Sequence, residues 1–91
     1  MKTLVNVTEV RPLGELKLLI RFSDGTEGER DFADYLRQDG PMLEPLKDPT
    51  YFARVFIEFG ALTWPNGFDL DPQNLHDMMQ REIMLKRSVA A

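Results

Sequence analysis

The chain has 91 residues, the size of one small domain, and 43% of them are apolar, which is enough for a single hydrophobic core. The absence of cysteine excludes disulfides and thiolate metal sites and indicates a reducing compartment, so we expect a cytoplasmic protein. Eleven basic and fifteen acidic residues give a net charge of −4, which disfavours independent binding to nucleic acid.

No part of the sequence has the character of an export signal or a membrane segment. The N-terminal residues lack the apolar run of a signal peptide, and no stretch approaches the roughly 18 to 20 apolar residues of a membrane span. We therefore expect a single domain over residues 1–91, neither exported nor inserted into a membrane. Residues 88–91 are expected to form a frayed tail.

The first third of the chain predicts three strands. Residues 3–10 are rich in β-branched side chains, and apolar side chains recur at every second position from Leu16 to Phe22, the period of a strand with one buried face. The Asp-Gly pair at 24–25 is a strong signal for a hairpin turn and places the third strand at 27–32.

The middle of the chain predicts little regular structure. Residues 33–38 contain helix formers and predict a short middle helix. The segment 42–49 carries two prolines, so we expect a buried loop that packs Leu43 and Leu46 onto the sheet. Asp48 is positioned to cap a single helical turn that begins at the next proline.

The last third predicts a second hairpin and a final helix. Residues 54–59 and 61–64 read as two strands joined at Gly60. After a Pro-Asn-Gly turn, Asp71 is expected to cap a C-terminal helix at 72–87. Residues 1–71 would then form a body rich in sheet, on which that helix packs.

The predicted fold is therefore α+β, with a mostly antiparallel sheet of about five strands in two hairpins, a short middle helix and a C-terminal helix packed on one sheet face. The expected core residues are Leu18, Ile20, Phe22, Leu36, Leu46, Phe52, Val55, Ile57, Trp64, Leu75 and Met79.

The apolar side chains of the last predicted helix spread over a wider arc than packing on one sheet face requires. The interpretation that the sequence favours is that this helix closes the open sheet face and that its methionines fill gaps in the core. The alternative is that residues 79–87 project past the sheet and bind a partner. The candidate interaction residues are Met79, Ile83, Met84 and Lys86.

A second candidate site surrounds the Trp-Pro-Asn-Gly turn. Its residues are Trp64, Asn66, Asp69, Asp71 and His76, and the spacing of the two aspartates can hold a hard cation. Local structure explains them better, because Asp71 serves as a helix cap, Asp69 as a turn residue and Trp64 as a core residue. A lone histidine without partners is expected at the surface or at the edge of a groove, and we expect no metal site and no cofactor.

The sequence shows no catalytic residues. A nucleophile and base would require Ser23 to meet His76 across the fold, together with a third group to orient the base. The glycines lack the spacing that would cradle a phosphate group. We therefore expect a protein that is not an enzyme.

Three motifs carry a resemblance to a known family. They are Phe22-Ser23-Asp24-Gly25, then Leu46-Lys47-Asp48 with Phe52, and Trp64-Pro65-Asn66-Gly67 leading into Asp69-Leu70-Asp71-Pro72 and Leu75. Over about residues 3–77 the chain resembles the bacterial domain-of-unknown-function family 2442. His76 departs from the pattern, since members often carry Tyr at this position.

The resemblance implies a compact α+β fold without an established activity. Some relatives carry this domain ahead of a helix-turn-helix region, for which we expect no room here, and stand-alone ones are often encoded next to a small partner in toxin–antitoxin pairs. Our hypothesis is a non-catalytic protein-interaction module, the antitoxin-like or regulatory member of such a pair. It would bind another small protein or a second copy of itself, through the last helix or an exposed strand edge. The alternative is a small ligand- or metal-sensing domain that uses the Trp-Pro-Asn-Gly corner.

Overall fold

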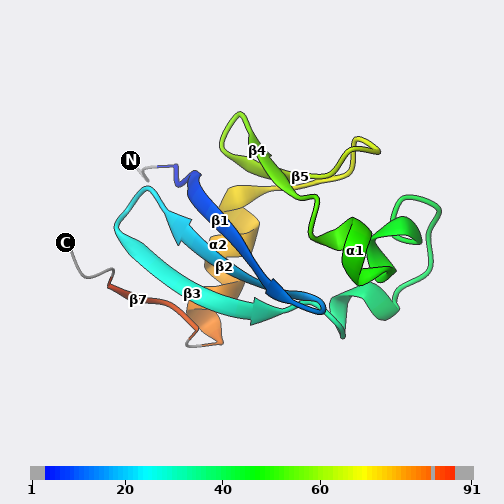
Figure 1. Cartoon of the computed structure of the whole chain (residues 1–91). Helices are drawn as coiled ribbons and strands as arrows, with labels where there is room; N and C mark the ends of the chain where they lie inside the picture. Colours follow the sequence, from blue (N-terminus) through cyan, green and yellow to red (C-terminus); the bar gives the residue numbers. More distant parts are fainter. Residues whose placement is uncertain (1–3, 83, 88–91) are drawn as a thin grey trace.

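The computed structural model describes residues 4–82 and 84–87 of the chain, and it has two antiparallel sheets (Figure 1). Sheet A has the strand order β1-β2-β3-β7, and sheet B has the order β4-β5-β6. The strands are β1 Val7–Gly14, β2 Lys17–Phe22, β3 Thr26–Asp31, β4 Phe56–Glu58, β5 Ala61–Thr63, β6 Asp69–Leu70 and β7 Lys86–Arg87. The helices are the 3-10 turns η1 Tyr35–Arg37 and η2 Pro45–Lys47, and the α-helices α1 Pro49–Phe52 and α2 Pro72–Arg81. An α+β fold with antiparallel strands is confirmed, whereas one sheet of about five strands is wrong.

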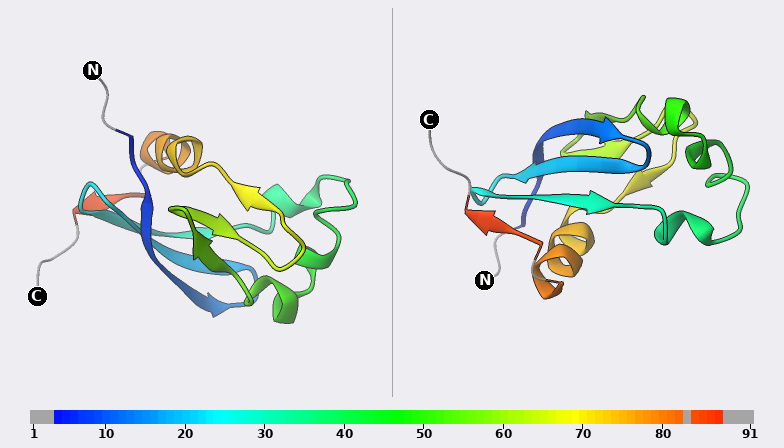
Figure 2. Two further views of the ribbon diagram at one scale, coloured as in Figure 1. Left: turned by 90° about the horizontal axis from the view of Figure 1, so that it is seen from above. Right: turned by 60° about the horizontal axis from the view of Figure 1, so that its bottom comes forward.

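Sheet A is built from the hairpins that the alternating pattern predicts. The alternating positions Leu18, Ile20 and Phe22 of β2 are fully buried, whereas strand β1 begins later than expected and continues to Gly14. Helix α2 covers the inner face of this sheet, as the two views of Figure 2 show. No helix in the described residues is long and apolar enough to cross a membrane.

Sheet B is smaller and lies beside β1, where the Val7 amide donates a hydrogen bond of 2.8 Å to the Gly60 carbonyl oxygen. The predicted hairpin is present as β4 and β5, although both strands are shorter than expected. A third strand, β6, pairs with β5 and was not predicted, since a two-residue strand leaves no periodic signal.

The C-terminal helix starts as predicted but ends earlier. The Asp71 side chain accepts a hydrogen bond from the Asn74 amide at the start of α2, yet the helix stops at Arg81 instead of continuing to residue 87. The chain then turns, and β7 pairs antiparallel with β3. Neither Gly nor Pro marks this end, so no stop signal was present to recognise.

One buried cluster joins both sheets and α2. Four aromatic rings run through it in sequence, with centroid distances of 5.5 Å between Phe32 and Phe52, 5.6 Å between Phe52 and Trp64, and 5.9 Å between Trp64 and Phe68. Aromatic pairs at this separation contribute beyond the area that they bury. The sheets therefore share a core although their strands do not pair.

Most of the predicted core is confirmed. Nine of the eleven expected residues are buried, while Val55 is half-buried and Ile57 is exposed. Ile57 lies in β4, at the edge of sheet B, and Val55 comes directly before that strand. The prediction also omitted buried residues outside clear alternation, namely Val5, Val7, Phe32 and Leu62, whereas Leu43 and Leu46 are buried as the loop prediction required.

Candidate functional site

The tip of the β4–β5 hairpin carries an aromatic side chain in an unfavourable setting. Phe59 and Gly60 form the connection with φ values of 51° and 77°, the left-handed conformation of both central residues in a type I′ turn. Asn or Gly is favoured there, because Cβ crowds the backbone of other residues. Phe59 is nevertheless 96% exposed and contributes no burial that would offset this strain.

The outer face of sheet B is acidic beside this aromatic residue. Side chains alternate along a strand, so the pairing of Phe56 with Thr63 and of Thr63 with Asp69 places all three on one face, together with Glu58. Phe56 is 41% exposed, and Glu58 and Asp69 are also exposed. A shallow hollow lies over this surface, and we call the residues that line it the hairpin face. They are Glu58, Phe59, Ala61, Thr63, Gly67, Asp69, Leu70, Asp71 and Pro72.

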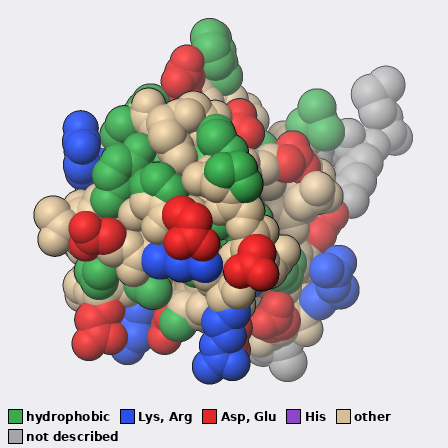
Figure 3. Space-filling model, turned by 90° about the vertical axis from the view of Figure 1, so that its right-hand side faces the viewer, with side chains coloured by type: hydrophobic (Ala, Val, Ile, Leu, Met, Phe, Trp, Pro, Cys, Tyr) green, Lys and Arg blue, Asp and Glu red, His purple; other side chains and the backbone are tan. Residues whose placement is uncertain are grey.

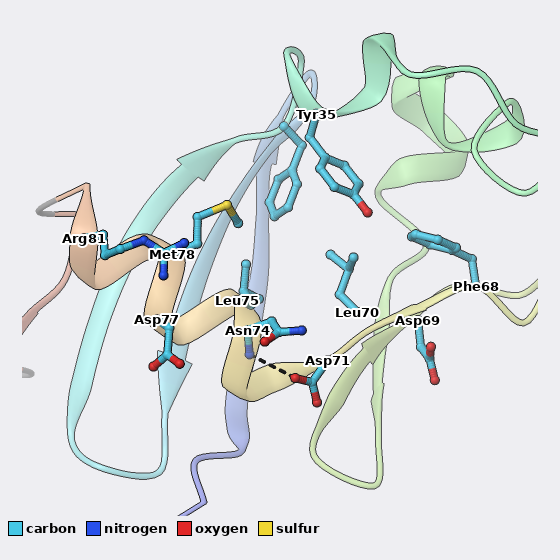
Figure 4. Close-up of a pocket in the computed structure, with 11 residues that line it drawn as sticks. Tyr35, Phe68, Asp69, Leu70, Asp71, Asn74, Leu75, Asp77, Met78 and Arg81 are labelled. Carbon is cyan, nitrogen blue, oxygen red and sulfur yellow. Dashed lines mark hydrogen bonds between the residues drawn. The ribbon is translucent and has the colours of Figure 1, made fainter.

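A pocket of about 410 Å³ lies on the other side of β6, between that strand, α2 and η1 (Figure 4). We call it the α2–β6 pocket. Its apolar lining is Phe32, Tyr35, Phe68, Leu70, Leu75 and Met78, and its polar lining is Asp69, Asp71, Asn74, Asp77 and Arg81. Figure 4 shows the apolar side chains around the centre, with Asp69 and Asp71 on the β6 side and Arg81 beside Met78.

The hairpin face and the α2–β6 pocket form one acidic surface. Asp69, Leu70 and Asp71 line both, because β6 separates the two hollows. The combined lining contains four carboxylates, from Glu58, Asp69, Asp71 and Asp77, and one guanidinium, from Arg81. A surface of this composition favours a ligand that presents apolar groups together with positive charge.

The predicted Trp-Pro-Asn-Gly corner is divided by the fold. Trp64 is 1% exposed, and its indole Nε1 donates a 2.9 Å hydrogen bond to the Phe52 carbonyl oxygen. The Asn66 side chain donates to the Met42 carbonyl oxygen and accepts from the Phe68 amide. These two residues support the turn, which leaves only Asp69 and Asp71 of the predicted corner on an open surface.

His76 is buried, contrary to the expectation of a surface position, but it does line a hollow together with Ser23 and Gln80, as the groove-edge expectation required. It is 6% exposed, its ring packs edge-on against Phe22, and its Nε2 lies 2.8 Å from Asp24 Oδ2. Nδ1 lies 3.6 Å from a carboxylate oxygen of Asp77. His76 thus connects α2 to the β2–β3 turn, and the Asp-Gly turn signal gave no indication of this long-range partner.

The carboxyl group of Asp24 is held ionised by its neighbours. Its partial burial would by itself raise the pKa, but hydrogen bonds from the Thr26 hydroxyl and amide, followed by the hydrogen bond and charge of His76, outweigh this effect and hold the pKa below its usual value. The arrangement stabilises the turn against the helix.

The described residues do not bring Ser23 and His76 into a hydrogen bond with each other. The Ser23 hydroxyl oxygen accepts a hydrogen bond from the Asn6 amide, and the His76 ring lies against Asp24. Among residues 4–82 and 84–87 no group of three or more His, Cys, Asp or Glu side chains is placed to hold a metal ion.

The candidates on the last helix fit the favoured interpretation, in which the helix closes the sheet face and its methionines fill the core, and not the alternative that residues 79–87 project past the sheet. Met79 is fully buried in the core, and Met84 is half-buried after the chain has turned, with its amide bonded to the Met79 carbonyl oxygen. Lys86 lies in β7 opposite Glu27. Ile83 lies outside the described residues.

Comparison with known proteins identifies the family of this chain and one protein of similar structure. The chain matches the model of a protein family of unknown function (DUF2442) over residues 7–78, and it belongs to this family. It is similar in structure to the putative DNA binding protein NE0471 from Nitrosomonas europaea ATCC 19718, with 26% sequence identity and a TM-score of 0.61 over 92% of this chain. The chain spans 66% of the length of that protein. No curated protein matches the sequence.

Proposed function

We propose that this chain is a non-catalytic protein-interaction module that binds a partner protein through the hairpin face. The observation that carries the proposal is Phe59, which combines almost complete exposure with a left-handed backbone conformation. A residue that lowers the stability of the isolated chain is explained if it stabilises a complex with a partner. Exposed aromatic residues are frequent anchors of protein interfaces.

The surroundings of Phe59 support a protein as its ligand. Phe56 extends the aromatic surface along β4, and the edge position of that strand leaves side chains accessible. Interface anchors are effective when polar groups surround them and exclude water, as the carboxylates of the hairpin face can do.

The charge of this surface favours a different protein over a second copy. Glu58, Asp69 and Asp71 line the hairpin face without a basic residue, so pairing this face with itself would bring like charges together. A partner with basic residues next to apolar ones is complementary. A regulatory, antitoxin-like role in a two-protein pair is consistent with this arrangement and rests on the family resemblance.

Binding to DNA is a weaker explanation. The similar protein from N. europaea is described as a putative DNA binding protein, but it is longer than this chain. The net charge of −4 opposes binding to phosphates. Over the face drawn in Figure 3, basic side chains are interspersed with acidic ones and do not form a continuous positive patch.

Photo-crosslinking tests the proposal. A photoreactive amino acid would replace Phe59 in one variant and Glu29 in a control, because Glu29 is exposed on the outer face of sheet A. The protein captured at position 59 would then be purified and its affinity measured for the wild-type chain and for Phe59→Asn. We expect crosslinking only at position 59 and a loss of affinity of about tenfold or more, the size expected for an aromatic anchor.

Two results would contradict the proposal. One is equal crosslinking at both positions, which would indicate no preferred face. The other is an unchanged affinity of the Phe59→Asn variant for the captured protein, which would show that the aromatic ring is not the anchor.

A further inference from the structure

We infer that the α2–β6 pocket receives one large apolar side chain of the partner, with an adjacent Lys or Arg side chain held by Asp69 and Asp71. This inference rests on the proposed function and assigns the chemistry of the segment that binds. The ligand is an extended protein segment in which an aromatic or large aliphatic residue has a basic neighbour.

The size and lining of the pocket fit a single apolar anchor. A volume of about 410 Å³ lies at the lower end of the range of ligand pockets, which begins at roughly 300 Å³. Phe32 and Leu75 are buried and provide a fixed floor, while Tyr35, Phe68 and Met78 are half-buried and form walls that a ligand can contact. An aromatic ring in such a site gains both area burial and ring contacts.

The charges beside the pocket select a basic neighbour. Asp69 is exposed on β6. Asp71 accepts a hydrogen bond from the Asn74 amide through Oδ2, which leaves its Oδ1 available to a cation. The single basic residue of the lining, Arg81, lies beside Met78, at the far end of the drawn pocket from these two aspartates (Figure 4). A cation that follows the apolar anchor would therefore meet negative charge at the β6 side.

The position of β6 supports an extended segment. The order β4-β5-β6 leaves β6 at an edge of sheet B, with hydrogen bonds to β5 on one side. Backbone groups at a strand edge can pair with an added strand, while pockets for side chains provide specificity. A segment laid along β6 would reach the pocket on one side and Phe59 on the other, since Asp69 and Asp71 line both hollows.

Three short peptides test the inference by NMR with methyl-labelled methionine. The probes are acetyl-Lys-Trp-Lys-amide, acetyl-Glu-Trp-Glu-amide and acetyl-Lys-Ala-Lys-amide, which separate the contributions of the ring and the charge. Met78 reports on the pocket, and Met42, exposed in another loop, reports on unspecific contact. We expect a saturable shift of the Met78 methyl signal with the Lys-Trp-Lys peptide alone, and weaker binding at higher salt.

A matched pair of variants locates the charge. Asp69→Asn should weaken binding of the Lys-Trp-Lys peptide several-fold, whereas Glu29→Gln, on the outer face of sheet A, should leave it unchanged. The inference would be overturned if the Met78 methyl signal did not shift, or if the Glu-Trp-Glu peptide bound as tightly as the Lys-Trp-Lys peptide. The titration needs no natural partner, so its failure would leave the crosslinking result at position 59 intact, and failure of the crosslinking would leave the titration intact.

Discussion

A row of charged side chains that pair with one another crosses the outer face of sheet A, whereas the outer face of sheet B carries exposed aromatic and acidic side chains. In sheet A a row of alternating charge crosses all four strands, from Glu9 through Arg21 and Glu27 to Lys86. Arg21 lies 3.2 Å from Glu9 and 3.1 Å from Glu27. In sheet B the corresponding positions are Phe56, Glu58 and Asp69, without a basic residue among them.

On the outer face of sheet A the paired charges find their partners within the chain, whereas the aromatic and acidic side chains of sheet B remain exposed to solvent. Cross-strand pairs of opposite charge stabilise a sheet in water and require no further partner. Exposed aromatic rings beside carboxylates gain little from water and are typical of a surface that becomes buried on binding. The smaller sheet is therefore where we place the interaction.

The largest expected losses of stability come from substitutions on the buried inner faces of the two sheets. Leu18 in sheet A and Leu62 in sheet B are both fully buried, so Leu18→Ala and Leu62→Ala should each lower the free energy of unfolding by about 2–5 kcal/mol. Urea unfolding would measure both. A much smaller loss for Leu62→Ala would break the comparison, because sheet B would then be a loosely attached hairpin and its exposed residues would need no function.

A second prediction concerns the closure of sheet A by β7. A Cβ atom at Gly28 would collide with the carbonyl oxygen of Met84, so Gly28→Ala should displace the last strand and cost about 1–3 kcal/mol. NMR would detect the loss of cross-strand contacts between Glu27 and Lys86. Glu29→Ala, at an exposed neighbouring position of β3, is the control and should retain these contacts.

The third prediction concerns the hairpin tip. Phe59→Asn should raise the free energy of unfolding by about 1 kcal/mol, because asparagine tolerates the left-handed conformation that Phe59 adopts. Phe59→Ala removes the ring without this conformational benefit and should give no such gain. If Phe59→Asn instead destabilises the chain, the ring contributes to the fold and the argument for an interface anchor is lost.

The fourth prediction tests how much the paired charges of sheet A contribute. Arg21→Ala should lower the free energy of unfolding by less than about 1 kcal/mol, because the Arg21 side chain is partly exposed and surface ion pairs are weak. The loss should shrink further at high salt. A loss of several kcal/mol would mean that sheet A depends on its outer face far more than surface pairing explains.

The fifth prediction concerns the contribution of Asp24 to the free energy of unfolding at acidic pH. Because the pKa of Asp24 is lowered in the folded chain, its carboxylate adds stability that is complete above the pKa of the unfolded chain, about 3.9, and that is lost as the pH falls through the lower folded value. The free energy of unfolding of Asp24→Asn should therefore fall less steeply than that of the wild type between about pH 5 and the folded value. Equal slopes would contradict the stabilisation of this carboxylate by Thr26 and His76.

Local sequence signals predicted much of the fold. Alternation identified β2, the Asp-Gly pair identified the β2–β3 turn, and Asp48 and Asp71 both cap helices as expected. What failed were features that depend on contacts distant in sequence. The end of α2 carries no Gly or Pro, and the only hint of β7 was Gly28, which permits close approach of another backbone.

The candidate site was only partly predictable for the same reason. Asp69 and Asp71 were identified by their spacing, but their combination with Phe59, Tyr35 and Met78 depends on how sheet B packs beside α2. The strain at Phe59 had a signal in the sequence, since a Phe-Gly pair occupies a turn where Asn-Gly is usual. His76 and Asp24 lie 52 residues apart, and no local pattern connects them.

The most direct test of the central claim is amide hydrogen exchange of the chain, measured alone and in complex with the protein captured at position 59. The account predicts slower exchange in residues 56–71, from β4 to β6, and unchanged exchange in residues 17–31 of sheet A. Slower exchange confined to residues 17–31 would contradict it, because the partner would then bind the face whose charges are already paired.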